Sequence, residues 1–320
     1  MRFPPIAKSN LTLWLRMVYQ WSRGNWKMKR SRSFATAIWI LISFFSITNT
    51  TSALAEDSLV TRLAGVSFKV ADLEKARQFY TGILGLEEAF DLRDSNGVVQ
   101  SIFFKVNDEQ YLEFSSGAPE KFELEHISLL SPDLKKSAAI LSKEGIIPGK
   151  ITRSGDGNLF FTIKDPDQVE LDFVQYMPGS QQVKHRGKSN GNAVSDHLQH
   201  VGVAPSDNAA TLAFYRDKLG FQQFSVTNSI NNHVMVSSSS GDAIELMTTL
   251  SDPVLIRQHI SFQVPDDIHR AYNLVRARGL QVSTEPIPSK FGHWMWNLRD
   301  PNGIRVEFAG EDVAPPQPAK

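Results

Sequence analysis

The stretch that decides the fold is GVSFKVADLEKARQFYTGILGL at residues 65–86, because it recurs as HVGVAPSDNAATLAFYRDKLGF at residues 200–221. The two copies align without a gap at an offset of 135 residues, which matches Tyr80 to Tyr215. A fixed internal period is the signature of a duplicated unit and sets the architecture of a chain. We therefore predict two similar domains.

The two copies differ at positions that can carry chemistry. The second copy has His200 and Glu307 where the first, at the same offset, has Gly65 and Asp172. Imidazole nitrogens and carboxylate oxygens bind divalent metal ions, whereas glycine offers no side-chain ligand. The second copy is therefore the one in which we expect a chemical site.

Length and composition limit the possible classes of protein. A chain of 320 residues suits two domains, and its hydrophobic fraction of 41% is ample for buried cores. The absence of cysteine excludes disulfides, thiolate nucleophiles and thiolate metal sites. Residues 1–55 hold eight basic and no acidic side chains, and the remainder has 26 basic against 34 acidic ones. This acidic body argues against a nucleic-acid partner, which would require a basic face.

The N-terminus has the three parts of a secretory signal. Four basic residues within 27–32 precede an apolar run of 14 residues at 34–47, and Ala53-Leu54-Ala55 follows as a cleavage site. The run is shorter than the ~20 residues that span a bilayer as a helix. We predict that residues 1–55 are a cleaved signal peptide, that the protein is exported to the periplasm or secreted, and that no stable membrane span remains. The alternatives are an uncleaved N-terminal anchor and a true start near Met28.

After residue 58 the pattern alternates short strands with amphipathic helices. Val66, Phe68 and Val70 repeat with the period of a strand. Asp72 follows at the position of a helix N-cap, where its carboxylate can accept the first free backbone N–H groups. Apolar residues then recur at helical spacing until Gly85 ends the helix. Further strands complete a β-α-β-β-β module.

This module occurs four times along the chain. We predict an α+β fold in which the modules form two pairs, each pair curving a mixed sheet around a cleft, because a lone module leaves one sheet face exposed. The first pair spans residues 60–177, and a polar interdomain linker follows at 178–196. The second pair spans 197–310, and the proline-containing tail at 311–320 is predicted to be disordered.

The pattern resembles the vicinal oxygen chelate superfamily, which includes glyoxalase I, extradiol dioxygenases and bleomycin resistance proteins. The resemblance covers nearly everything from residue 60 to 310. Its marks are the first-strand His200, the Phe-Tyr-x-x-x-Leu-Gly helix end at 214–220, and the Asp-Pro-Asn-Gly turn at 300–303 that precedes Glu307. These marks are specific for the superfamily and indicate no single reaction within it.

The resemblance implies a metal site built from the first and last strands of modules three and four. The implied ligands are His200, Glu245, His259 and Glu307. Strand alternation puts the small residues Gly202 and Ala204 on the face of His200, which leaves room for an ion and a substrate. Two imidazoles and two carboxylates suit Mn, Fe(II), Co, Ni or Zn. Two adjacent substrate oxygens would complete the coordination, and a carboxylate that loosens from the ion would act as general base.

The corresponding positions of the first pair are Gly65, Glu113, His126 and Asp172. Gly65 cannot bind a metal, and the side chain of Asp172 is one methylene shorter than that of glutamate. We interpret this pair as a degenerate site that is structural or binds a ligand without metal.

Two further residues bear on the reaction. His293 falls on the cleft face by strand alternation and is a candidate acid or base, so the candidate catalytic residues are Glu307, Glu245 and His293. Asn297 occupies a place where extradiol dioxygenases usually carry a tyrosine that assists oxygen chemistry, and its presence counts against ring cleavage.

Three functions remain open on the sequence alone. The first is a metal-dependent lyase or isomerase of the glyoxalase kind, acting on a small substrate with vicinal oxygens. The second is an extradiol-type dioxygenase with Fe(II) held by His200, His259 and Glu307. The third is a non-catalytic protein that binds a small molecule. Each of them has a small-molecule partner, and either a monomer or a homodimer is compatible with the tandem pairs.

Overall fold

The computed structural model describes most of the chain after the N-terminal segment. The described residues are 59–313 except 119–121, 189–190, 225–231, 236–239, 248–257, 266 and 290–291. They belong to one unit, Ser58–Lys320. The predicted signal peptide, the alternative start at Met28 and the tail after Val313 lie outside the described residues. None of the described helices combines the length and apolarity that crossing a bilayer requires.

The first domain is built on one eight-stranded sheet in the order β2-β3-β4-β1-β5-β8-β7-β6. Its strands are β1 (Arg62–Val70), β2 (Glu87–Arg93), β3 (Val99–Lys105), β4 (Tyr111–Ser116), β5 (Phe122–Leu130), β6 (Thr152–Arg153), β7 (Leu159–Lys164) and β8 (Glu170–Gln175). Its helical segments are α4 (Leu73–Arg77), η1 (Gln78–Ile83), α5 (Leu134–Lys143) and α6 (Gln181–Lys184).

The second domain repeats this order in a second eight-stranded sheet, β10-β11-β12-β9-β13-β16-β15-β14. Its strands are β9 (Leu198–Val203), β10 (Gln222–Phe224), β11 (Asn232–Met235), β12 (Ala243–Leu246), β13 (His259–Val264), β14 (Ile287–Pro288), β15 (His293–Arg299) and β16 (Arg305–Val313). Its helical segments are α7 (Asn208–Ala213), η2 (Phe214–Lys218) and α9 (Ile268–Ala277).

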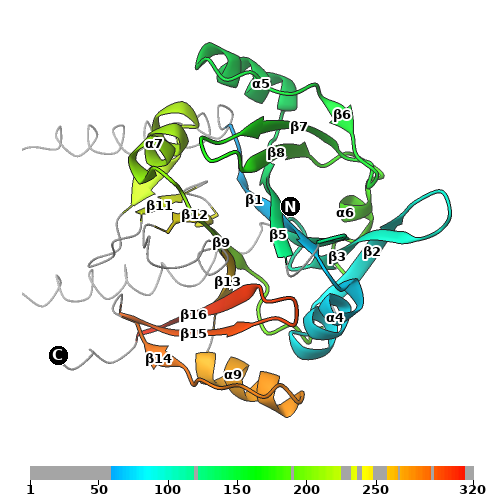
Figure 1. Cartoon of the computed structure of the whole chain (residues 1–320), viewed down its shortest axis with the longest axis vertical. Coiled ribbons are helices and arrows are strands. Elements are labelled where there is room, and N and C mark those ends of the chain that lie inside the picture. The colour runs from blue at the N-terminus through cyan, green and yellow to red at the C-terminus, as the bar shows by residue number, and fades with distance from the viewer. Residues whose placement is uncertain are drawn as a thin grey trace, which may run out of the picture. The chain divides into compact units, whose positions relative to one another are not determined.

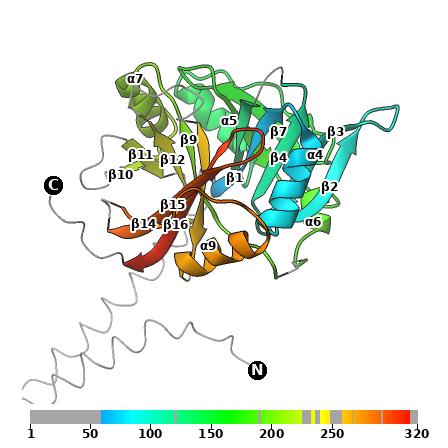
Figure 2. The same ribbon diagram turned by 60° about the horizontal axis from the view of Figure 1, so that its bottom comes forward.

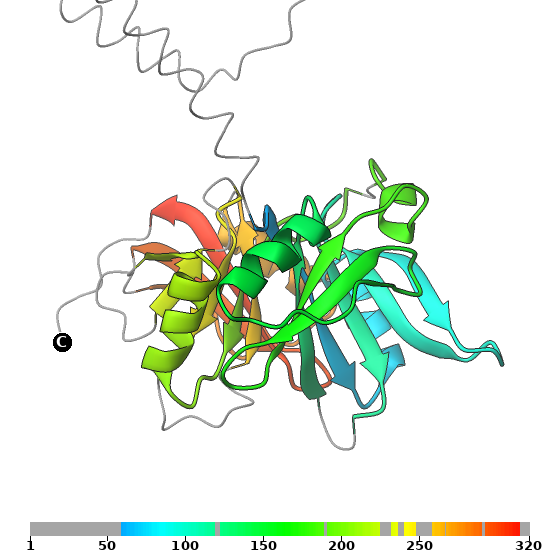
Figure 3. The same ribbon diagram turned by 90° about the horizontal axis from the view of Figure 1, so that it is seen from above.

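Each sheet joins two modules through their first strands. In the first domain β1 pairs with β5 in antiparallel fashion and with β4 in parallel fashion, and β9 relates to β13 and β12 in the same way. Both sheets are mixed, and they are curved (Figures 1, 2 and 3). Each module carries its own helix. In the last module, for example, α9 packs along β15 and β16 (Figures 1 and 2). The predicted α+β fold of four modules in two pairs is confirmed.

The shared Phe-Tyr helix of modules one and three ends in a π-helical turn that the sequence did not predict. Asp72 caps α4 by accepting the N–H of Lys75, as expected, but the helix widens to i→i+5 hydrogen bonding from Gln78 to Ile83. The same change occurs from Phe214 to Lys218. A π turn adds one residue to the turn and so redirects the side chains that follow.

The tyrosines of these turns connect the two domains. The hydroxyl of Tyr80 donates to Oδ2 of Asp300 at 3.3 Å, and the equivalent hydroxyl of Tyr215 donates to Oδ2 of Asp165 at 3.1 Å. Each aspartate begins an Asp-Pro turn, at 165–166 and at 300–301, and these turns are related by the offset of 135. Each domain therefore places its helix against a turn of the other.

A second reciprocal contact joins the strand edges near β1 and β9. Oε1 of Gln110 accepts the N–H of Leu198 at 3.0 Å, and Oδ2 of Asp242 accepts the N–H of Leu63 at 3.0 Å. Gln110 and Asp242 each come directly before the last strand of their module, and the two leucines are related by the offset of 135. The apolar side chains of both domains belong to one continuous core.

Two predicted boundaries differ from the structure. The interdomain segment 178–196 contains the helix α6 and is fastened to the first domain, since the buried Lys105 donates from Nζ to the carbonyl of His185 at 2.6 Å. The described part of this linker is thus held against the first domain. At the other end, β16 continues through Val313, three residues into the predicted tail, by pairing with β15.

Candidate metal centre

Strand register gathers the four implied ligands on one face of the second sheet. In one row of residues paired across neighbouring strands, which we call a rung, Ser261 of β13 lies between two ligands. It is opposite His200 of β9 on one side and Glu307 of β16 on the other. On the neighbouring rung, Gly202 lies opposite both Glu245 of β12 and His259 of β13. Residues two apart on a strand share a face, so both rungs direct these side chains to the same side.

Three of the four side chains meet at one point. Nε2 of His200 lies 3.1 Å from Nε2 of His259, and Oε2 of Glu245 lies 3.5 Å from the first imidazole and 3.2 Å from the second. All three residues are buried. In the part of the chain that the structure describes, they are the one group of His and acidic side chains whose ligand atoms all lie within 4.8 Å of one another.

Glu307 lies beside this group. Its Oε1 is 3.8 Å from Nε2 of His200 and accepts a long hydrogen bond from Ser261 at 3.4 Å. Its other oxygen, Oε2, accepts from the guanidinium of Arg305 at 2.6 Å. One oxygen of Glu307 is therefore directed to the imidazole cluster while the other is committed to Arg305.

The electrostatics of the group favour the ionised form of Glu245. Burial alone would raise the pKa of Glu245, but the hydrogen bonds from His200 and His259 outweigh it and hold that pKa well below its usual value. Burial lowers the pKa of His293, with Glu307 opposing and His200 adding to the effect. His293 thus lies within electrostatic reach of the cluster, as its predicted place on the cleft face requires.

The donor set fits a divalent transition-metal ion. Neighbouring ligands of an ion with bonds of ~2.1 Å lie about 3.0 Å apart in octahedral and about 3.4 Å apart in tetrahedral geometry. The observed separations of 3.1, 3.2 and 3.5 Å match this range. Imidazole and carboxylate together suit Mn, Fe(II), Co, Ni or Zn. The small residues opposite them, Gly202 and Ser261, leave the face of the cluster uncovered by their own side chains.

The first domain has the same register with an incomplete set. Ser67 lies opposite both Glu113 and His126, as Gly202 lies opposite Glu245 and His259. Gly65, at the position of His200, runs so close to β4 that a Cβ would lie 2.0 Å from the carbonyl oxygen of Tyr111. The missing ligand is therefore a consequence of the backbone path and not only of the residue type.

Sequence reasoning missed two features near these clefts. One is the contact of Arg305 with Glu307, for which the spacing of two residues on one strand was the available signal. Sequence reasoning predicted a cleft in the first domain but not that residues 152–156, after α5, line its cavity. Asn297 lies opposite Glu307 in the pairing of β15 with β16.

Comparison with protein families agrees with the tandem arrangement. The model of the Glyoxalase/Bleomycin resistance protein/Dioxygenase superfamily matches the chain twice, at residues 62–173 and 197–308. Among curated proteins, the uncharacterized protein YwbC of Bacillus subtilis is 26% identical over 122 residues, which cover 36% of this chain and 97% of that protein.

Solved structures share the fold across both domains. The Mn(II)-bound glyoxalase from Novosphingobium aromaticivorans has a TM-score of 0.63 and 17% identity, with 79% of this chain and 82% of that one covered. The 2,3-dioxygenase LapB from Pseudomonas sp. KL28 has a TM-score of 0.61 and 15% identity, with 82% and 95% covered. With the family match spanning both domains, the chain belongs to the glyoxalase, bleomycin resistance protein and dioxygenase superfamily.

Proposed function

We propose that this protein is a divalent-metal-dependent lyase or isomerase of the glyoxalase kind, acting on a small substrate with two adjacent oxygen atoms. The observation that supports it is the convergence of His200, Glu245 and His259 on one point, at separations suited to a shared ion. Glu307, 3.8 Å from His200, is the fourth candidate ligand.

The residues of the site divide the work. His200, Glu245 and His259 hold the ion, which when bound supplies a Lewis acid that stabilises negative charge on a substrate oxygen. Glu307 is the candidate general base, because one of its oxygens is directed to the cluster and the other is held by Arg305. Arg305 orients this carboxylate by donating to Oε2. His293, kept neutral by burial, is a second group that can take up a proton.

An Fe(II) extradiol-type dioxygenase is the second candidate, supported by the likeness of fold to LapB. His200, His259 and Glu307 would be its two-histidine, one-carboxylate triad. Two observations weigh against it. Glu245 lies nearer the imidazoles than Glu307 does, and the residue opposite Glu307 is the exposed Asn297.

The metal content of purified protein tests the proposal. Elemental analysis of protein prepared without added metal should give close to one divalent ion per chain, and His259→Ala should lose it. Glu113→Gln, at the position in the first domain equivalent to Glu245, is the matched control and should keep it. Equal metal content in His259→Ala and in the unaltered protein would place the ion elsewhere and remove the basis of the proposal.

The type of reaction needs a separate experiment. Oxygen uptake with catechols after reconstitution with Fe(II) distinguishes the two candidates, because a lyase or isomerase consumes no oxygen. Exchange of substrate C–H hydrogen with deuterated solvent, measured by NMR on small α-hydroxycarbonyl compounds, reports proton abstraction. Metal-dependent exchange without oxygen uptake supports the lyase or isomerase, and oxygen uptake with ring cleavage would replace it by the dioxygenase.

We also propose that the protein is exported and that the signal is removed after Ala55. The basic, apolar and small-residue parts of residues 1–55 support this. Sequencing of the mature N-terminus should begin at Glu56. A mature chain that still contains Trp39 would contradict removal of the signal.

A further inference from the structure

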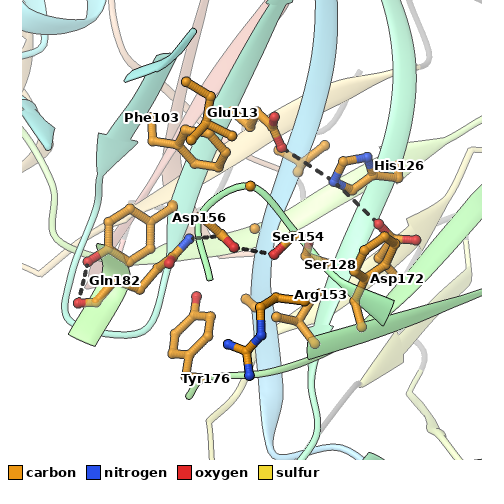
Figure 4. A pocket seen from close by; sticks show the side chains of 18 of the residues that line it. Phe103, Glu113, His126, Ser128, Arg153, Ser154, Asp156, Asp172, Tyr176 and Gln182 are labelled. Atoms are coloured by element: carbon orange, nitrogen blue, oxygen red, sulfur yellow. Dashed lines mark hydrogen bonds and ion pairs between the residues drawn. The ribbon is translucent and has the colours of Figure 1, made fainter. Parts of the chain in front are cut away.

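The cleft of the first domain contains a well-formed cavity. Its volume is about 420 Å³, within the ~300–1,000 Å³ typical of sites for small ligands. Side chains from β3, β4, β5, β7 and β8 line it, and residues Thr152 to Asp156 close one side (Figure 4). The lining residues on which the argument rests are Phe103, Tyr111, Glu113, His126, Asp172 and Tyr176.

Three polar side chains from three strands point toward one another in this cavity. Nε2 of His126 lies 3.6 Å from Oε2 of Glu113 and 3.9 Å from Oδ2 of Asp172 (Figure 4). Both separations exceed a hydrogen bond of ordinary length. Asp172 uses its other oxygen, Oδ1, to accept from Thr162 at 2.5 Å. Each carboxylate thus directs one oxygen toward His126 at a distance beyond an ordinary hydrogen bond, and Ser101 hydrogen-bonds to the carboxylate of Glu113.

Acidic side chains predominate among the titratable groups in this part of the cavity. Glu113 and Asp172 face His126, and Asp156 lies at the cavity wall, where Ser154 and Gln182 donate to its oxygens. Glu125 adds to the negative potential at Glu113. The one cation among the lining residues, Arg153, is exposed and donates to the carbonyl of Gly157. A ligand cation would gain from this field, whereas an anion would be repelled.

Aromatic rings form the other part of the wall. The hydroxyl of Tyr111 donates to the carbonyl of Gln182, and that of Tyr176 donates to the carbonyl of Glu109. Because both hydroxyls are used within the protein, these residues, like Phe103, offer their rings to the cavity. Ring faces attract organic cations and bury apolar groups at the same time.

We propose that the cleft of the first domain is a binding site for a small organic amine in its protonated form, with the ammonium group between Glu113, Asp172 and His126 and an apolar body against Phe103, Tyr111 and Tyr176. The ammonium group has three donors, which suits the two carboxylate oxygens that face His126. A metal ion would lack the fourth ligand, since Gly65 has no side chain and no room for one. This proposal is independent of the metal centre in the second domain.

A charge series of similar size tests the chemical class. Isothermal titration of the full chain with 2-phenylethylamine, 2-phenylethanol and 3-phenylpropanoate should rank them in that order. A charged hydrogen bond in a desolvated site corresponds to a difference of about tenfold or more in Kd between the amine and the alcohol. Saturable amine binding with this order supports the proposal. Equal or tighter binding of the carboxylate, or no saturable binding of the amine at millimolar concentration, would overturn it.

Two kinds of variant locate the binding. Glu113→Gln and Asp172→Asn keep the shape of the side chains and should each weaken the amine about tenfold or more, while 2-phenylethanol binds as before. Glu123→Gln removes an exposed carboxylate from the same strand as His126 and should leave amine binding unchanged. Glu245→Gln changes the equivalent position in the second domain and should leave amine binding unchanged. If this variant alone lost amine binding, the amine would bind in the second domain and the proposal would be overturned.

The dependence of amine affinity on pH is a further test, because a purely structural effect of the substitutions would not change it. Burial raises the pKa of Glu113 to about 7, with His126 and Ser101 opposing and Glu125 and Asp156 adding to the shift. Burial also raises the pKa of Asp172. Because the amine needs the ionised form, its affinity should increase as the pH rises from 6 to 8, while the affinity for 2-phenylethanol stays flat. Glu113→Gln should reduce the slope, and an unchanged slope in this variant would contradict the assignment.

Discussion

Tyr80 of the first domain donates its hydroxyl hydrogen to Oδ2 of Asp300 in the second, 220 positions further along the chain. The equivalent pair, Tyr215 and Asp165, repeats the bond in the opposite sense. These residues belong to the helix and turn motifs that mark the family in the sequence. In this chain the motifs therefore join the two domains in addition to shaping each module.

This bond leads to a prediction about pH and stability. Burial raises the pKa of Asp300 to about 6, against hydrogen bonds from Ile304, Asn302 and Tyr80. The folded state then favours the protonated carboxyl, so the contribution is fully present below pH ~4 and is lost as the pH rises through 6. The shift corresponds to roughly 1–3 kcal/mol of unfolding free energy. Asp300→Asn should reduce the fall in Tm between pH 4.5 and 7.5.

Thermal unfolding across that pH range is the measurement. At pH 7.5 Asp300→Asn should be at least as stable as the unaltered protein, because the amide retains an acceptor for the backbone and removes a buried charge. Asp267→Asn, an exposed helix cap, serves as the control and should leave the slope unchanged. A slope in Asp300→Asn equal to that of the unaltered protein would refute the assignment.

A second prediction concerns Arg305. Its guanidinium holds Oε2 of Glu307 at 2.6 Å, so Arg305→Met should release that carboxylate. Removing a partner that orients a metal-site residue typically reduces metal affinity or activity about 10–100-fold. Competitive titration with a metal indicator, followed by turnover measurements, would check this.

Arg299 provides a matched control on the neighbouring strand. It lies opposite Arg305 in the pairing of β15 with β16, is exposed, and donates to the carbonyl of Gly303. Arg299→Met should leave metal affinity within about twofold. Similar losses in both variants would show that general charge, and not the contact with Glu307, is responsible.

A third prediction concerns the missing ligand of the first domain. Gly65→His should fail to create a second metal site and should destabilise the protein, because even a Cβ would lie 2.0 Å from the carbonyl oxygen of Tyr111. Gly65→Ala tests the steric part alone and should lower the free energy of unfolding by about 1–3 kcal/mol.

Chemical denaturation and metal analysis measure these effects. Gly82→Ala is the control, because a Cβ there meets no atom within 4 Å, and its stability should match or exceed that of the unaltered protein. Gly65→His that binds a second ion with unaltered stability would contradict the close approach of β1 to β4.

A fourth prediction concerns the contact between the domains at Gln110. This buried amide accepts the N–H of Leu198 and donates to the carbonyls of Leu63 and Leu198. Gln110→Leu would leave those backbone groups without their partner, at a cost of about 1–3 kcal/mol for each group that stays buried. Denaturant unfolding should show the loss, and the exposed substitution Gln100→Leu should stay within ~0.5 kcal/mol. An unaffected Gln110→Leu would mean that water replaces the amide.

Much of the fold was predictable because the duplication presents the sequence pattern of each element twice. The strand pattern of Val66, Phe68 and Val70 falls within β1, and Asp72 caps α4 as its position indicates. Val201 and Val203 are buried on the helix side of β9, as their alternation with His200 indicates. Local periodicity decides such features, and it is visible in one chain.

The remaining features depend on tertiary contacts that have no local signature. Nothing in the composition of Gln78–Ile83 distinguishes a π turn from an α turn, since the choice is linked to the contact of Tyr80 with the other domain. The polar composition of 178–196 favoured a linker, yet Lys105 fastens it to the first domain. The cavity near Glu113 likewise depends on the closing segment after α5, whose position is not encoded by strand alternation.

The reciprocal bonds between the domains have a consequence for biosynthesis. Tyr80 is made 220 residues before Asp300, which at ~5–20 residues per second means a wait of roughly 10–45 seconds on the ribosome. Throughout that interval the face of the first domain that contacts the second lacks the partners that the second domain supplies. The apolar surface beside it stays exposed to water. The first half can therefore complete its contacts with the second only after the final strands of the chain have been made.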